Sequence, residues 1–166
     1  MSLRSRFRPW ALAGILAALA GLAGARSQEE DLLKIECSVA PKRLSRGEGG
    51  KAVIKLAVTE GVLISALPSF TIDFNATPEI AFPKNFFTAS DLEIGVVETP
   101  DGSFLDLTKP IAIPFTVAPD AKPGGHILEG RIKYFARSSR EGWCYKTISK
   151  FSAAFTTRSA SVVKKK

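Results

Sequence analysis

"HILEGRIKYFARSSREGWCYKTISKFSAAFTT", residues 126–157, contains two segments in which apolar and polar side chains alternate. A period of two is typical of a β-strand with one buried face. Between the segments lies Arg140-Glu141-Gly142, where glycine permits the positive φ of a tight turn. The stretch therefore predicts a long β-hairpin near the carboxyl end of the chain.

The same period-two pattern recurs along the chain, and no comparably long helical pattern follows residue 30. Clusters of Gly, Pro and Asp separate the runs and provide the turns between them. About seven to nine short strands at this spacing predict an all-β, immunoglobulin-like antiparallel sandwich. The apolar positions of the other runs are Leu33, Ile35, Cys37 and Val39; Ala52, Ile54, Leu56 and Val58; Phe70, Ile72 and Phe74; Leu92, Ile94 and Val96; and Ile111, Ile113, Phe115 and Val117.

Residues 1–25 have the three parts of a secretory signal peptide: a basic start, a short apolar core and a small-residue exit at Ala23-Gly24-Ala25. The apolar run is shorter than the roughly 20 residues that a spanning helix needs. We therefore predict cleavage near Ala25 and export to the periplasm. The mature chain is then a sandwich domain over residues 26–157 and a basic, disordered tail over residues 158–166.

The distribution of charge argues against nucleic-acid binding. The whole chain carries +7; removing Arg4, Arg6 and Arg8 leaves 7 − 3 = +4, and removing Arg158 and residues 164–166 leaves 4 − 4 = 0. A protein that follows phosphates needs a clustered basic face. We predict no nucleic-acid partner, and at most a weak contact between the lysine-rich tail and an anionic membrane surface.

The two cysteines have different surroundings. Cys37 is in register with the apolar positions of its strand, where a thiol behaves as a small hydrophobic group with a raised pKa. Cys144 follows the polar turn, near Arg137 and Arg140, whose charges favour a nucleophilic thiolate. Because export favours pairing, a Cys37–Cys144 disulfide is the alternative, with a stabilisation of roughly 4 to 5 kcal/mol. The sequence leaves both open.

Other chemistry-bearing residues form no catalytic or metal-binding set. Trp143 and Tyr145 flank Cys144, and they either pack into the core or shield the thiol and form a docking surface. The one histidine, His126, starts a strand and is interpreted as a surface residue. We predict no metal site and no cofactor. Any catalysis would be thiol–disulfide exchange at Cys144.

The segment "GGHILEGRIKYFARSSREGWCYKTISKFSAAF" resembles the closing hairpin of the amino-terminal periplasmic domain of DsbD, a thiol:disulfide interchange protein. Tyr134 matches the tyrosine of the family's Y-x-x-C pattern, Glu141-Gly142 its turn, and Cys144-Tyr145 its second cysteine and neighbour. The resemblance implies an immunoglobulin-like sandwich. It also implies a functional hairpin surface made by Tyr134, Arg137, Ser138, Trp143 and Tyr145.

The chain departs from that family at the first cysteine, which the pattern expects at Arg137 or at Ser138. The usual prolines after the second cysteine are also absent, replaced by Lys146-Thr147. A dithiol cycle needs both sulfurs, because the second one resolves the mixed disulfide. We therefore predict an interaction or accessory module for a thioredoxin-like or other envelope protein, without an independent catalytic cycle. The alternative is a single-cysteine accessory in which Cys144 exchanges disulfides with a thioredoxin-like partner; a hydrolase or metal enzyme has no supporting set of residues.

Overall fold

The computed structural model describes residues 32–158, and these residues contain β-strands and no helix. The predicted signal peptide and residues 159–166 of the predicted tail lie outside the described residues. Arg158, which we assigned to the tail, is the last residue of the final strand. The strands are β1 Leu33–Ala40, β2 Arg43–Ser45, β3 Gly49–Val58, β4 Val62–Ile64, β5 Thr71–Phe74, β6 Ile80–Ala81, β7 Phe86–Thr88, β8 Gly95–Thr99, β9 Gly102–Asp106, β10 Ile111–Val117, β11 Gly124–Ser138 and β12 Cys144–Arg158.

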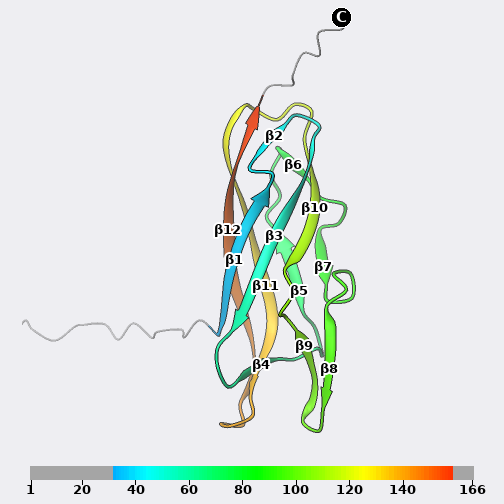
Figure 1. Ribbon diagram of the computed structural model, residues 1–166, viewed down its shortest axis with the longest axis vertical. Helices are drawn as coiled ribbons and strands as arrows, with labels where there is room; N and C mark the ends of the chain where they lie inside the picture. The colour runs from blue at the N-terminus through cyan, green and yellow to red at the C-terminus, as the bar shows by residue number, and fades with distance from the viewer. Residues whose placement is uncertain (1–31, 159–166) are drawn as a thin grey trace, which may run out of the picture. The chain divides into compact units, whose positions relative to one another are not determined.

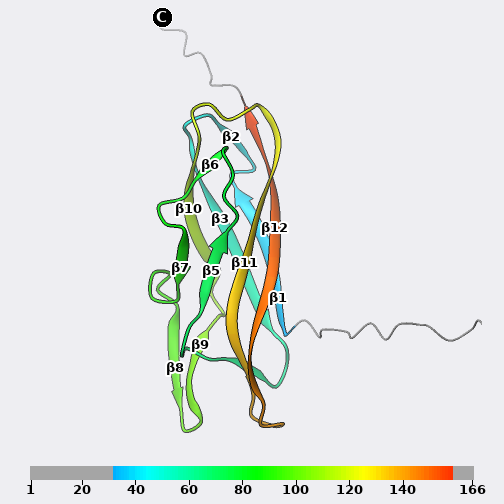
Figure 2. The ribbon, with the colours of Figure 1, turned by 180° about the vertical axis from the view of Figure 1, so that it is seen from behind.

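The strands form two facing sheets and a small ribbon. One sheet has the order β1-β3-β10-β6, and it faces the viewer in Figure 1. The other has the order β2-β12-β11-β5-β7, with β4 also on β11, and it faces the viewer in Figure 2. Among the described residues, strands β8 and β9 form a two-stranded sheet of their own, and an isolated Ser65–Phe104 bridge links β9 to the segment after β4. All neighbours are antiparallel except β2 and β12, so the predicted immunoglobulin-like antiparallel sandwich is confirmed. The strands beyond the expected seven to nine are pieces of two or three residues.

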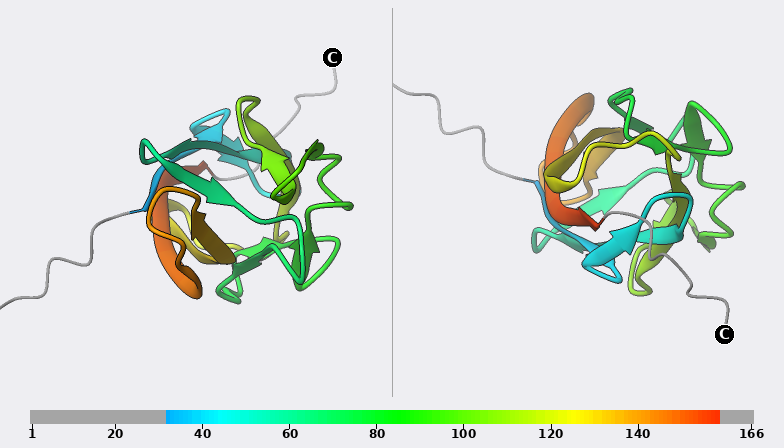
Figure 3. Two further views of the ribbon diagram at one scale, coloured as in Figure 1. Left: turned by 90° about the horizontal axis from the view of Figure 1, so that it is seen from below. Right: turned by 90° about the horizontal axis from the view of Figure 1, so that it is seen from above.

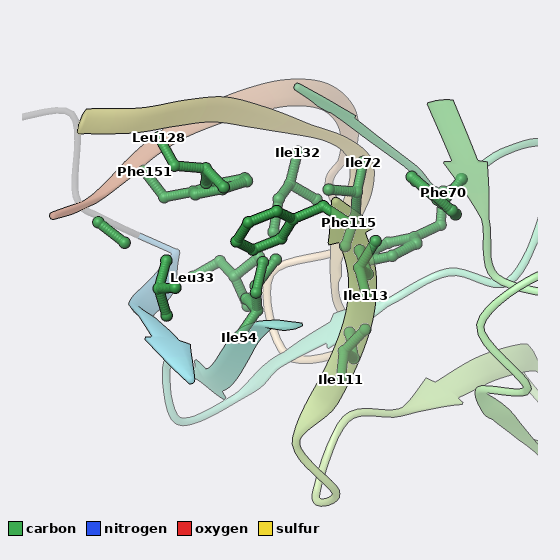
Figure 4. Packing of buried hydrophobic residues seen from close by; sticks show 14 of the residues in the cluster. Leu33, Ile54, Phe70, Ile72, Ile111, Ile113, Phe115, Leu128, Ile132 and Phe151 are labelled. Carbon is green, nitrogen blue, oxygen red and sulfur yellow. The ribbon is translucent and has the colours of Figure 1, made fainter. Parts of the chain in front are cut away.

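The core lies between the two sheets and follows from the alternation in the sequence. Buried and exposed residues alternate strictly along β10, and the inward positions of β11 are buried from Leu128 onward. Figure 4 shows side chains of both sheets, among them Ile113 and Ile132, meeting between the layers. Neither of these two has any exposed surface. Burial of each such side chain contributes about 1.5 to 3 kcal/mol, so the sandwich needs no disulfide.

One predicted strand is wrong. Leu92 lies in a turn, Ile94 directly follows that turn, and the strand starts only at Gly95. The turn is closed by reciprocal hydrogen bonds: the Thr88 backbone N–H donates to Asp91 Oδ2 (3.0 Å), and the Asp91 N–H donates to Thr88 Oγ1 (3.2 Å). Side chains that bond to the nearby backbone compete with strand pairing, which explains why the alternation failed here.

Candidate functional site

The tip of the β11–β12 hairpin is built around Ser138. Its N–H donates to the Trp143 carbonyl (3.0 Å), and its carbonyl accepts from the Gly142 N–H (2.9 Å). Gly142 has φ 74°, which is a left-handed conformation that glycine adopts without strain. The Ser138 hydroxyl accepts the Glu141 N–H (3.2 Å) and the residue is buried. The expectation that Ser138 forms part of the hairpin surface is therefore wrong, because this residue holds the turn together.

Cys144 is exposed and begins β12 directly opposite Arg137 of β11. Because Ser138 bonds to Trp143, the next pair, Arg137 and Cys144, is a non-hydrogen-bonded pair with Cα atoms about 4.5 Å apart. The Arg137 guanidinium donates to the Asp101 carbonyl in the β8–β9 turn. On its other side, Arg137 pairs with Leu63 of β4. The outer face of the sheet therefore presents Leu63, Arg137 and Cys144 in one row across three strands.

The aromatic residues of the hairpin do not shield the thiol. Trp143 and Tyr145 pack against each other with ring centroids 4.7 Å apart, and the Trp143 indole N–H donates to Glu141 (2.7 Å). Successive residues of a strand face opposite ways, so both rings lie on the side of β12 away from Cys144. Trp143 packs against the core while Tyr145 stays 47% exposed.

Tyr134 is also not a surface residue. It is 1% exposed, and its hydroxyl lies 3.0 Å from Ser149 Oγ across the hairpin. Tyr134 has the same parity as Ile132 along β11, and this parity places both side chains in the core. Of the hairpin surface implied by the family resemblance, Arg137, Trp143 and Tyr145 remain at least partly accessible.

Cys37 packs against the core as predicted, and burial raises the pKa of its thiol to about 11. A bridge to Cys144 is not formed, since both cysteines are free. Ile35 of β1 borders the same hollow as Phe151 of β12, whereas Cys144 lies seven positions before Phe151 on an extended strand. At about 3.3 Å per residue, Cys144 lies roughly 20 Å along β12 from Phe151, and therefore about as far from the part of β1 that carries Ile35 and Cys37. A disulfide allows only ~7 Å between the two Cα atoms.

An apolar cleft lies at the same end as the hairpin tip. Its volume is about 510 Å³, and its walls come from β3, β4 and the β8–β9 ribbon. Figure 3, left, shows the hairpin tip in orange, β4 in teal and the ribbon in light green at this end. Leu63, 37% exposed, and Val97, 50% exposed, belong to its lining. The cleft could not be predicted from the sequence, because its walls come from segments far apart along the chain; the apolar runs at residues 62–64 and 96–97 were the available signal.

The described region has neither a metal-binding cluster nor a membrane-spanning helix. Residues 32–158 contain no group of three or more His, Cys, Asp or Glu side chains placed to hold a metal ion. Within the same range no helix is long and apolar enough to cross a bilayer. His126 is half-buried; its Nε2 lies 2.8 Å from the Lys122 carbonyl, and its ring stacks on Phe155.

No protein-family profile and no curated protein matches the sequence. Solved structures similar to the chain include a cohesin module from a family 33 glycoside hydrolase of Clostridium perfringens, with 10% identity over 76% of this chain and 96% of that one, TM-score 0.37. The major pilin subunit BcpA of Bacillus cereus has 10% identity over 75% of this chain and 40% of that one, TM-score 0.42. AggA, the major subunit of Escherichia coli aggregative adherence fimbriae type I, has 11% identity over 76% of this chain and 95% of that one, with a TM-score of 0.36. At such low identities and TM-scores, these likenesses carry no argument about function.

Proposed function

We propose that this protein is an exported interaction module that binds another envelope protein at the hairpin end of the sandwich, without a catalytic cycle of its own. The observation that supports the proposal is the apolar cleft between β3, β4 and the β8–β9 ribbon. Export rests on the signal-peptide pattern of residues 1–25. Relationship to the amino-terminal domain of DsbD rests on the hairpin motif around Cys144.

The cleft has the character of a binding surface. Apolar side chains dominate it, and a hollow of this size can take a few side chains of an extended segment. Exposed apolar surface that is gathered in one place usually marks an interaction site. Leu63 is both part of the lining and a neighbour of Arg137, so a bound segment would lie about two strand spacings, roughly 10 Å, from Cys144.

The test is site-specific photo-crosslinking of the full-length protein in cells that export it. A photoreactive phenylalanine analogue at Leu63 should give a discrete adduct with an envelope protein. The matched control is the same analogue at Ile127, which is 62% exposed but lies outside the cleft lining. Val97→Asp, which puts a charge in the cleft wall, should abolish the adduct at Leu63. The same adducts at both positions, or an adduct that Val97→Asp does not affect, would overturn the proposal.

A second candidate function, single-cysteine thiol exchange, is favoured by the position of Cys144. The residue is exposed, and the residue opposite it, Arg137, occupies one of the two places where the resemblance expects the missing cysteine. Ser138, the other place, faces the core. In the exchange, the Cys144 thiolate attacks a partner's disulfide, forms a mixed disulfide and releases the partner's other sulfur as a thiolate. A thiol of a thioredoxin-like protein then attacks the mixed disulfide and releases Cys144.

Alkylation followed by mass measurement tests this second candidate. Near neutral pH, Cys144 should be modified rapidly and Cys37 slowly, because a thiol with a pKa of about 11 has little thiolate. A thioredoxin-like protein that lacks its resolving cysteine should be trapped on the wild type and not on Cys144→Ser. Arg137→Cys should form a bridge with Cys144, whereas Ser138→Cys should not. Failure of the trap with wild type, under conditions that trap a two-cysteine relative, would reject the exchange role.

A further inference from the structure

We propose that copies of this protein associate side by side, with the free edge of β8 in one copy pairing antiparallel with the free lower edge of β12 in the next. This inference goes beyond the proposed function, because it uses two strand edges and not the cleft. An unpaired strand edge presents backbone N–H and C=O groups that a strand from another chain can complete.

The lower half of β12 has such an edge. Within residues 32–158, β12 pairs with β11 along Cys144–Thr157 and with β2 only at Thr156–Arg158. Because Arg137 and Cys144 form a non-hydrogen-bonded pair, alternate residues from Cys144 direct their backbone groups away from β11. These residues are Cys144, Lys146, Ile148 and Lys150. Figure 2 shows the β11–β12 hairpin continuing past the beginning of β1, so that β1 leaves this part uncovered.

Strand β8 has the second free edge. Its only partner among the described strands is β9, and all five of its residues are exposed. The Ser103 carbonyl accepts the Ala66 N–H from the far side of β9 (2.9 Å), so Ser103 and its partner Glu98 form a non-hydrogen-bonded pair. The backbone groups of Glu98 and, by alternation, Val96 therefore point to the open side.

The two edges carry opposite charge. Residues 95–106 of the ribbon contain Glu98, Asp101 and Asp106 and no lysine or arginine, whereas residues 144–150 contain Lys146 and Lys150 and no carboxylate. Among the described residues, neither lysine has a carboxylate within ion-pair distance. Asp73, which is separated from Lys150 by Arg131 across the sheet, pairs with Arg131 and Lys133. Like charges therefore disfavour pairing of β12 with β12 or of β8 with β8, and opposite charges favour β8 with β12.

One register matches side chains as well as charge. Antiparallel pairing that sets Glu98 opposite Lys146 of the next copy also sets Val96 opposite Ile148 of that copy. Val96 and Ile148 are 51% exposed each, so this register buries apolar surface that the single copy leaves in water. All four residues have outward backbone groups, as a hydrogen-bonded pair requires.

The directions of the strands allow this pairing without turning the second copy. In Figure 1 the arrow of β8 points down and the arrow of β12 points up, so a copy in the same orientation brings the two strands together antiparallel. The two edges belong to different sheets, because β12 lies in the six-stranded sheet and β8 in the two-stranded ribbon. Such a heterologous contact leaves one edge free at each end and continues into a row of copies.

The experiment is sedimentation velocity of the mature chain in the Cys144→Ser background, over a range of protein and salt concentrations. We expect concentration-dependent association that weakens with salt. Glu98→Lys and Lys146→Glu should each weaken association roughly three- to thirtyfold, and the double variant should restore it because the opposite charges meet again. Glu48→Lys, which lies on neither edge, is the control and should leave association unchanged.

A cross-link tests the register directly. In a Cys144→Ser background, a chain carrying Val96→Cys together with Ile148→Cys should give a ladder of disulfide-linked species on oxidation, and Val96→Cys alone should not go beyond dimers. Monomers at every concentration, or a double charge reversal that fails to restore association, would overturn the proposal. Photo-crosslinking at Leu63 does not depend on association of copies, so failure here leaves the result for the cleft unaffected.

Discussion

The β11–β12 hairpin and the β8–β9 ribbon are the same motif used in two ways. Each strand of the hairpin has 15 residues, with alternate residues in the core, whereas each strand of the ribbon has five, and those of β8 are all exposed. The hairpin is the centre of a sheet and the ribbon is a sheet of its own. Burial and strand pairing with β4 and β5 together join the hairpin to the fold, whereas the ribbon is held through β9, which carries the buried Phe104 and Leu105. The outer strand of the ribbon, β8, is left free to bind.

This comparison predicts unequal responses to the same substitution. A Cβ on Gly130 of β11 would lie 2.4 Å from Phe151 Cζ and 2.7 Å from the Asp73 carbonyl, whereas one on Gly95 of β8 would lie 3.5 Å from Asp106 Cβ. Gly130→Ala should therefore lower the free energy of unfolding by about 1 to 3 kcal/mol, and Gly95→Ala should change it by less than about 0.5 kcal/mol.

Urea unfolding followed by the fluorescence of Trp143, the one tryptophan after the predicted cleavage site, measures both variants. Gly125→Ala is the control within β11, because nothing lies within 4 Å of the added methyl group. Equal losses for Gly130→Ala and Gly95→Ala would mean that the ribbon is as tightly packed as the hairpin.

Arg137 of the β11–β12 hairpin donates a hydrogen bond to the β8–β9 ribbon. Removing its guanidinium should therefore lower the stability of the ribbon and leave that of the hairpin unchanged. Arg137→Met keeps most of the side chain's length and loses the hydrogen bond to the Asp101 carbonyl. Amide exchange at Val97 in the ribbon should become about fivefold faster, which corresponds to about 1 kcal/mol, while exchange at Ile132 in the hairpin stays the same. Arg140→Met at the exposed turn is the control. Faster exchange at Ile132 as well would show that the ribbon opens only with the whole sandwich.

Long runs of alternation explain which parts of the fold were predictable. The strands around Cys37, Ile54, Phe115 and Ile132 follow from a period of two over seven or more residues. The same parity also predicts that Tyr134 and Ser138 face inward, and here the residue pattern was a better guide than the family motif. Where a local turn replaces the alternation, as at Leu92, the pattern misleads.

The candidate site needed information that periodicity does not contain. The cleft and the two free edges depend on strand order, which is set by contacts between residues far apart in the sequence. The sequence supplied the exposed Cys144 and its neighbour across the turn, Arg137. It did not supply Leu63 on the far side of Arg137, because only the pairing of β4 with β11 brings that residue there.

The smallest effect is expected at the turn that leads into the ribbon. Hydrogen bonds from the Lys84 ammonium and from Thr88 lower the pKa of Asp91 to about 2, from 3.8 for the free side chain. A carboxyl whose pKa is lower in the folded state stabilises that state above the unfolded value, and the contribution disappears as the pH falls. The turn should therefore loosen between about pH 4 and pH 2.

The Ile94 N–H donates to the Ala89 carbonyl (3.0 Å). In the wild type, the protection of this amide against exchange, relative to the intrinsic rate at each pH, should fall over that interval. Asp91→Asn keeps the shape of the side chain but removes its titration. Above pH 4 the Ile94 amide of this variant should be less protected than in the wild type, and its protection should change little between about pH 4 and pH 2. Glu93→Gln in the same turn serves as the control and should keep the wild-type profile. If Asp91→Asn also keeps it, the turn is held by its backbone hydrogen bonds and not by the charge of Asp91.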